Sequence, residues 1–304
     1  MITIRWCNYA LDELNRIWYN TDMETTKKYF EEFERLFHNE QTCIDYLYNL
    51  RWKNGWRCPR CSHNEHWKVG DMKYKCKECG YQSTIISGTL LQRSHLSISK
   101  WLRSTWYVAN ETGCANALEM QNLIDLGSYH TALSVLNKIR IAISRCTEYK
   151  LNGSVIVDDV YIKSDKGSVP YHTYIAVEVK ENGYGQIRME LHSQTDYFSF
   201  ILSNVAKGSN IQTNGMNIYT TVPEDYKLAV INKKSGSKTL PLIKDIVNEI
   251  IDRRLLGGRQ SSCSYSNCDL CLEECCFKFN RRNKKAESLF EEILCSALKT
   301  ETTL

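Results

Sequence analysis

The sequence is poor in proline, in glycine runs and in long apolar stretches. Only 4 of its 304 residues are proline, and 11% are aromatic, which argues against an extended disordered chain and against a collagen-like one. The longest apolar runs, such as Ser154-Val-Ile-Val, cover only a few residues, which is too short for a membrane span. The first nine residues are too interrupted by polar groups for a signal peptide. We therefore expect a cytoplasmic protein with no membrane association.

The chain also has little net charge, +4 overall, but that charge is unevenly distributed. Residues 51–150 contain 15 lysines and arginines against 7 acidic residues, whereas residues 1–50 are acidic and residues 151–304 are balanced. A basic segment suits a polyanionic partner, although a solvated surface gives the same count. Cysteine, in contrast, is abundant, with 14 residues. In a reducing cytoplasm these favour metal ligation or buried thiols over disulfides.

Apolar periodicity predicts a multidomain α+β protein. Residues 1–50 form a helical lead-in in which Asn39 is a plausible N-cap. Residues 51–92 lose this periodicity and carry paired cysteines, and residues 93–150 are helical again. Residues 151–304 form an α/β segment that ends in helices. Its predicted strands are Ser154 to Ile162, Tyr171 to Val179, Gln186 to His192 and Asn210 to Thr213.

Two Cys-x-x-Cys knuckles, Cys58-Pro-Arg-Cys61 and Cys76-Lys-Glu-Cys79, are separated by 14 residues. Zinc takes four soft ligands in a tetrahedron, and each knuckle aims two thiolates at one point. The doubled spacing therefore predicts a zinc ribbon with a structural Zn²⁺ held by Cys58, Cys61, Cys76 and Cys79. His63 and His66 lie between the knuckles and are less favoured as replacement ligands.

Residues Ala115 to Ile124 and Tyr129 to Arg145 have helical periodicity and are joined by a short turn that contains Gly127. Such a turn, with Ser128 as N-cap, predicts a helix-turn-helix, and an ordinary helical hairpin gives the same pattern. Inward-facing residues of the second helix would be Leu133, Leu136, Ile139 and Ile143. Outward-facing candidates for contacts in a DNA major groove are His130, Thr131, Ser134, Asn137 and Lys138.

Asp158 and Asp159 interrupt an otherwise apolar predicted strand. A buried carboxylate needs a compensating cation, and divalent metals are a common solution. The alternative from this strand alone is a pair of acids at a frayed strand end.

The order of these motifs resembles the zinc-ribbon insertion-sequence transposases related to the Merlin superfamily. The resemblance runs from about Gln41 to Arg282. It includes Ser87-Gly88-Thr89, Asn137-Lys-Ile-Arg140, Val157-Asp-Asp-Val-Tyr-Ile, Lys207-Gly-Ser-Asn-Ile-Gln-Thr-Asn-Gly215, Leu255-Leu-Gly-Gly258 and Leu272-Glu-Glu-Cys-Cys-Phe-Lys-Phe-Asn280-Arg-Arg282. It implies an ISXO2-like DDE transposase domain with a ribonuclease-H-like fold after the DNA-binding part.

The resemblance also implies a site. Asp158 matches the first catalytic aspartate, Asp159 the adjoining acidic position, and Asn214 the second aspartate. Glu249 or Asn248 matches the third position, and Glu249 is preferred for its charge. These residues would hold Mg²⁺ or Mn²⁺ for strand cleavage and transfer. Asn214 lacks the charge of the family's aspartate, and the basic Gly-Gly-Lys segment of the family is reduced here to Lys163-Ser-Asp-Lys166-Gly.

A second group of cysteines and a basic run allow two interpretations each. Cys263, Cys268, Cys271 and Cys275 could bind a second zinc. The alternative is that Cys271, Cys275 and Cys276 serve as small hydrophobic core residues, because the related sequences carry aromatic or aliphatic residues there. The run Arg281, Arg282, Lys284 and Lys285 could contact phosphate or form a solvated helix face.

The function predicted from the sequence is therefore a DDE-type DNA transposase that binds double-stranded element ends and target DNA as a homo-oligomer, associated with the nucleoid. The first alternative is a catalytically inactive, transposase-derived DNA-binding protein, because Asn214 replaces an aspartate. A third hypothesis is a zinc-ribbon module that binds protein instead of DNA.

Overall fold

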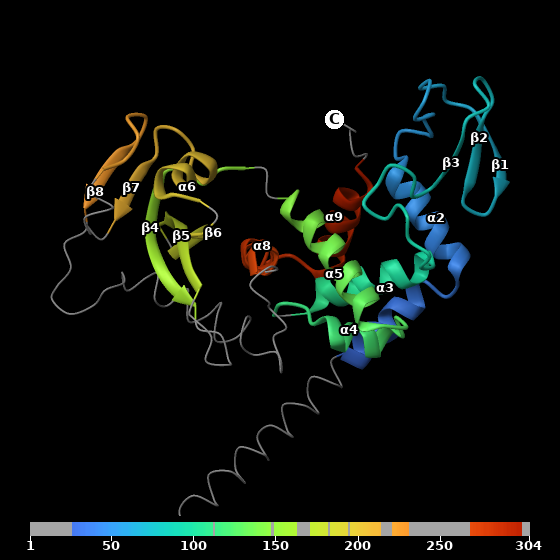
Figure 1. The fold of residues 1–304 in the computed structure, drawn as a ribbon, viewed down its shortest axis with the longest axis horizontal. Helices are drawn as coiled ribbons and strands as arrows, with labels where there is room; N and C mark the ends of the chain where they lie inside the picture. The colour runs from blue at the N-terminus through green and yellow to red at the C-terminus, as the bar shows by residue number, and fades with distance from the viewer. Residues whose placement is uncertain are drawn as a thin grey trace, which may run out of the picture. The chain divides into compact units, whose positions relative to one another are not determined.

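The computed structural model describes residues 26–111, 113–146, 149–162, 171–181, 183–193, 195–213, 221–230 and 268–299. These residues form a mixed α+β structure with two separate sheets (Figure 1). The chain divides into two compact units. The first consists of Met1–Ile85 with His95–Trp106, and the second of Ile86–Ser94 with Tyr107–Leu304.

The first unit combines helices with a small antiparallel sheet. A helix covers residues 26–36, and it is followed by α2 (Glu40–Arg51), β1 (His66–Gly70), β2 (Lys73–Cys76), β3 (Gln82–Thr84) and α3 (Ile98–Asn110). The strand order is β1-β2-β3. Trp101 and Trp106 of α3 are 2% and 1% exposed, so both are core residues.

The start of α2 links two helices of this unit. Asn39 caps α2 as predicted, because its side chain accepts the Thr42 amide at 2.9 Å. The next residue, Glu40, accepts the amide of Ile98 at 2.6 Å and that of Ser99 at 3.0 Å. A carboxylate at this position satisfies amides at the start of α3 and interacts favourably with the helix dipole.

The second unit contains the helix pair and the larger sheet. Its helices are α4 (Ala117–Ile124), α5 (Tyr129–Ser144), α6 (Tyr197–Asn204), α8 (Cys268–Asn280) and α9 (Ala286–Leu298). Its strands are β4 (Ser154–Ile162), β5 (Tyr171–Lys180), β6 (Gly183–Leu191), β7 (Asn210–Thr213) and β8 (Lys227–Val230). The predicted bounds of β4 and β7 agree with the structure, whereas α6 and β8 were not predicted.

The five strands lie in the order β6-β5-β4-β7-β8. Strands β4, β5 and β6 form an antiparallel meander, and β7 and β8 extend the sheet in parallel with β4. Strand β4 is therefore a central strand with partners on both sides. Within the part of the chain that the structure describes, no helix is both long and apolar enough to cross a bilayer.

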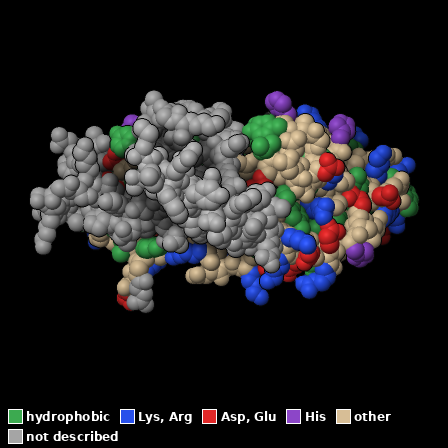
Figure 2. Space-filling view, turned by 90° about the horizontal axis from the view of Figure 1, so that it is seen from below, with side chains coloured by type: hydrophobic (Ala, Val, Ile, Leu, Met, Phe, Trp, Pro, Cys, Tyr) green, Lys and Arg blue, Asp and Glu red, His purple; other side chains and the backbone are tan. Residues whose placement is uncertain are grey.

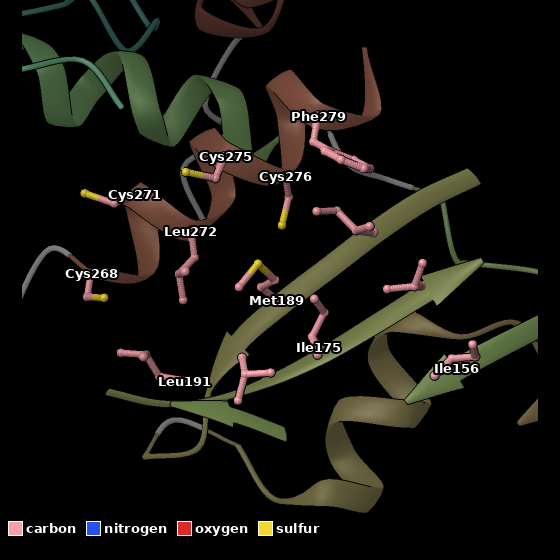
Figure 3. Packing of buried hydrophobic residues seen from close by; sticks show 13 residues of the cluster. Ile156, Ile175, Met189, Leu191, Cys268, Cys271, Leu272, Cys275, Cys276 and Phe279 are labelled. Carbon is pink, nitrogen blue, oxygen red and sulfur yellow. The ribbon is translucent and has the colours of Figure 1, made fainter. Parts of the chain in front are cut away.

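Both faces of the sheet are covered by helices, and each face has its own core. On one face, Val155 and Val157 of β4 pack with Phe200 and Ile201 of α6. On the other face, Ile156 and Val160 belong to a cluster completed by α8. Figure 3 shows Leu272 and Cys276 of α8 pointing toward the strands of this sheet. Alternate residues of β4 thus enter opposite cores, as expected for a strand buried on both sides.

Candidate metal centre and acidic strand

The four knuckle cysteines converge as the spacing predicts. The Sγ atoms of Cys58 and Cys79 are 3.6 Å apart, as are those of Cys61 and Cys76, and all four lie within 4.8 Å of one another. Four sulfurs at about 2.3 Å from a tetrahedral zinc have S–S edges of about 3.8 Å. The four thiols therefore fit a structural Zn²⁺, and a four-cysteine shell leaves no position for a substrate.

The two knuckles have the same backbone structure. The amide of Ser62 donates to the carbonyl of Cys58 at 2.9 Å, and the amide of Gly80 donates to that of Cys76 at 3.2 Å. Ser62 and Gly80 both have positive φ, 61° and 67°. Each knuckle thus ends in a left-handed residue, a conformation that glycine adopts at little cost and serine does not.

The knuckle backbone also favours thiolates. Burial tends to raise the pKa of Cys58, but the amides of Cys61 and Arg60 that face its sulfur lower the pKa to about 7. The pKa of Cys76 is lowered in the same way, where burial is outweighed by hydrogen bonds from the amides of Cys79 and Glu78. Because zinc binds the thiolate, these amides prepare the ligands for the metal.

One face of the ribbon packs on α2 through aromatic side chains. Tyr74 is 3% exposed, and its ring centroid lies 5.3 Å from those of Tyr48 and Trp52. His66 lies 5.1 Å from Tyr74 and 4.8 Å from Trp56. His66 is therefore part of this aromatic cluster and lies outside the cysteine group.

The opposite face of the ribbon is open and basic. Trp67 pairs with Lys75, and Lys75 pairs with Gln82, so that these three side chains lie in a row across the three strands. Trp67 is 51% exposed, and Lys73 on the same face of β2 is exposed as well. These residues were not predicted to bind a partner, although Lys73 and Lys75 alternate with the buried Tyr74 and Cys76.

Helices α4 and α5 form the predicted helix pair. The turn between them has positive φ at Asp125 and Gly127, and Ser128 caps α5 by accepting the Thr131 amide at 3.1 Å. Leu136, Ile139 and Ile143 are buried as predicted, and Leu133 is half-buried.

The five DNA-contact candidates of α5 differ in accessibility. His130 and Ser134 are exposed, whereas Thr131, Asn137 and Lys138 are half-buried. Lys138 donates to the carbonyl of Gln92 at 3.0 Å. The exposed face of α5 therefore offers His130 and Ser134 most directly.

Asp158 and Asp159 point to opposite faces of the sheet. Asp158 has no exposed surface, and strand alternation places it with Ile156 and Val160 on the face covered by α8. Asp159 lies on the α6 face, where its Oδ2 is 2.7 Å from Nε2 of His172. The two carboxylates therefore have separate environments. A carboxylate as deeply buried as Asp158 requires compensation by a cation or by hydrogen-bond donors.

The remaining residues proposed for this site, Asn214, Asn248 and Glu249, lie outside the described residues, as does Cys263. Cys271, Cys275 and Cys276 belong to the apolar cluster between α8 and the sheet, in agreement with their interpretation as small hydrophobic residues. Among the described residues, only the ribbon cysteines form a group of ligand type and spacing suited to a metal ion.

A buried ionic cluster, absent from the sequence analysis, joins α5 to α8. Glu274 has no exposed surface, and its carboxylate accepts from Nε of Arg140 at 2.8 Å, from Nζ of Lys278 at 2.8 Å and from the amide of Ala115 at 2.9 Å. Burial acts to raise the pKa of Glu274, but the charges of Lys278 and Arg140 lower it below its ordinary value.

The basic run after α8 has structural partners. Arg281 is 6% exposed and forms an ion pair with Glu292. Arg282 donates to the carbonyls of Tyr184 at 2.9 Å and Gly185 at 3.3 Å. Both arginines are therefore engaged within the protein. Figure 2 shows basic side chains interspersed with acidic ones on the face it presents, so charge alone does not locate an interface there.

Comparison with known proteins finds two similarities. Residues 38–82 match the model of the transposase zinc-ribbon domain, a range that includes α2 and both knuckles. The chain is 25% identical over 134 residues to an uncharacterised protein in transposable element ISH50 of Halobacterium salinarum, covering 43% of this chain and 44% of that protein. The match thus spans less than half of the relative's length. No solved structure matches the chain.

Proposed function

We propose that this protein is the transposase of an insertion sequence. The observation that carries the proposal is the match of residues 38–82 to the transposase zinc-ribbon domain, because the same residues form a four-cysteine site with zinc-like geometry. The partial similarity to the ISH50 protein supports it. In this proposal, the ribbon and the helix pair bind double-stranded DNA, and the domain that contains the larger sheet cleaves and joins strands as a homo-oligomer on paired element ends.

The topology of the larger sheet supports a ribonuclease-H-like DDE domain. An antiparallel meander is extended by two strands parallel to its first strand, and the acidic residues lie on that first, central strand. The β4–β7 ladder pairs Ile156 with Gln212. Because the two strands are parallel, Asp158 and the last residue of β7, Thr213, lie toward the same end of the sheet.

Each residue of the proposed site has a distinct role. Asp158 would supply a negatively charged ligand, Asn214 a neutral carbonyl ligand, and Glu249 or Asn248 the third group. Divalent cations bound there would neutralise charge on the attacking and leaving oxygens of a phosphodiester. Asp159 would act differently, because its carboxylate faces His172 on the other side of the sheet.

Cleavage is tested on DNA that carries the element's own ends, with Mg²⁺ or Mn²⁺. The native protein is expected to nick and join this DNA, and Asp158→Asn to bind it without nicking. Asp159→Asn is the matched control on the opposite face and is expected to retain nicking. Nicking by Asp158→Asn, or none by the native chain with either metal, contradicts the proposed chemistry.

DNA binding is tested through the open face of the ribbon. Each phosphate contact contributes about 0.9 to the slope of log K against log salt, so Lys75→Gln should lower that slope by about 1 and weaken binding to all sequences alike. Lys77→Gln is the control, because Lys77 pairs with Glu65 at 3.3 Å. Binding that is insensitive to salt would favour a protein partner.

A catalytically inactive DNA-binding protein is the second candidate function, because Asn214 stands where related transposases have an aspartate. The substitution Asn214→Asp distinguishes the two. Metal-dependent nicking that appears only in this variant identifies the native protein as inactive. Equal nicking by both proteins identifies Asn214 as a functional ligand.

A further inference from the structure

Three aromatic rings form a continuous stack across neighbouring chain segments on the α6 face of the larger sheet. The rings of Tyr161 on β4 and His172 on β5 are 4.5 Å apart and nearly parallel, with an interplanar angle of 5°. The rings of His172 and His192 are also 4.5 Å apart, at 17°. This set, Tyr161, His172 and His192, is called the ring stack below.

Hydrogen bonds position the middle ring of the stack and its neighbour. The carboxylate of Asp159 can only accept, so Nε2 of His172 donates to it at 2.7 Å and orients the middle ring. The amide of His192 donates to the carbonyl of His172 at 2.9 Å, which fixes the two histidines side by side. A ligand that joins the stack therefore loses little side-chain entropy on the protein's part.

The outermost ring is open. Tyr161 is 63% exposed, the largest exposure among the large hydrophobic side chains of the described residues. Beside the other end of the stack lies an open cleft of about 430 Å³ that is lined by Tyr174, His192, Ser193, Thr195, Asp196 and Ser199.

We propose that the ring stack binds an unpaired nucleobase of a DNA strand, stacked on Tyr161. This inference rests on the proposed function for its ligand, because a protein that opens strands presents unpaired ends. Parallel rings on a sheet face resemble the stacking platforms of proteins that bind single-stranded nucleic acids. A paired base has both faces covered within the duplex, so the site should discriminate against duplex DNA.

The test uses the full-length protein and a 12-nucleotide single strand that carries 2-aminopurine, whose fluorescence falls on stacking, at an internal position. A duplex of the same sequence, in which both faces of that base are covered, is measured beside it. The native protein and Tyr161→Phe should quench the probe in the single strand. Tyr161→Ala should lose that quenching and bind the single strand at least about fivefold more weakly, with duplex affinity unchanged. Tyr149→Ala, which removes another exposed aromatic residue, should behave as the native protein.

Quenching and single-strand affinity that are unaffected in Tyr161→Ala would overturn the inference, and so would an equal loss of single-strand and duplex binding. The measurement needs neither metal nor cleavage. If the protein fails to nick DNA but Tyr161→Ala loses quenching, the ring stack is a base-binding site and only the catalytic proposal fails. If the protein nicks DNA but quenching is independent of Tyr161, the catalytic proposal stands and only the base-binding proposal fails.

Discussion

The substitution Glu274→Gln should strongly destabilise the second unit. The carboxylate of Glu274 is fully buried and compensates two cations, Arg140 and Lys278, whose side chains are each only 5% exposed. Glutamine preserves the shape but leaves both charges buried without an anion. Breaking a buried ionic cluster in this way costs about 3–5 kcal/mol. With a urea m-value of about 2–3 kcal/mol/M, the unfolding midpoint should fall by about 1–2.5 M.

The distribution of tryptophan allows this effect to be assigned to one unit. Every tryptophan of the described residues lies in the first unit, as Trp52, Trp56, Trp67, Trp101 and Trp106, and the remaining two, Trp6 and Trp18, precede residue 26 in the sequence. Far-ultraviolet circular dichroism reports on both units, whereas tryptophan fluorescence reports on the first. Glu274→Gln should therefore lower the midpoint of one unfolding transition detected by circular dichroism and leave the midpoint detected by fluorescence unchanged.

Two comparisons can refute this reasoning. Glu65→Gln removes an exposed ion pair, with side chains 39% and 61% exposed, and should cost no more than about 1 kcal/mol. If Glu274→Gln costs as little, the buried cluster contributes no net stability. The triple variant Arg140→Met, Glu274→Leu, Lys278→Met should recover most of the loss, since it removes every buried charge.

The effect should also depend on pH in a defined direction. The pKa of Glu274 is lowered in the folded protein, so the contribution of its carboxylate to stability is fully present above the ordinary glutamate pKa of 4.5. The contribution is lost as the pH falls through the lower folded-state pKa. The stability difference between native protein and Glu274→Gln should thus be constant from neutral pH to about 5 and shrink in stronger acid.

Three further predictions concern the ribbon. Removal of zinc by a chelator should lower the unfolding midpoint detected by fluorescence and leave the transition of the second unit unchanged. The reason is that the binding energy of a structural metal contributes directly to folding. An unchanged midpoint would contradict a structural metal. Gly80→Ala should destabilise the first unit by about 1–2 kcal/mol because φ is 67° at this position. Ser62→Gly at the equivalent position of the other knuckle should stabilise the first unit by up to about 1 kcal/mol. If both substitutions change the free energy of unfolding in the same direction, the two knuckles are not equivalent.

Features that depend on local chemistry were predictable from the sequence. Asn39 and Ser128 were identified as N-caps because short polar side chains before an apolar periodic run satisfy helix amides, and both do so. The bounds of β4 follow from an apolar run that ends in polar residues. The zinc ligands follow from the repeated knuckle alone. In each case the deciding residues lie within a few positions of one another.

Features that depend on distant contacts were not predictable. Arg140 was noted only as part of a motif, yet it pairs with Glu274, 134 positions away. Arg281 and Arg282 were considered as phosphate contacts or as a solvated face, but Arg281 pairs with Glu292 of α9 and Arg282 donates to the carbonyl of Tyr184 in β6. The sequence around a charged residue does not indicate whether the fold brings an oppositely charged residue into contact with it. The amphipathic signal of α6 was also too short to separate it from a loop.

Helix α8 contacts both the helix pair and the larger sheet, which explains why they belong to one compact unit. Leu272 and Cys276 enter the core of the sheet, and Asn280 accepts the amide of Ile187 at 2.7 Å and donates to its carbonyl at 3.0 Å. Glu274 on the same helix holds Arg140 of α5. A displacement of α5 therefore has to break buried charge contacts or move α8 with it. If α5 binds DNA as proposed, a displacement of α5 on binding would be transmitted through α8 to the sheet that carries Asp158.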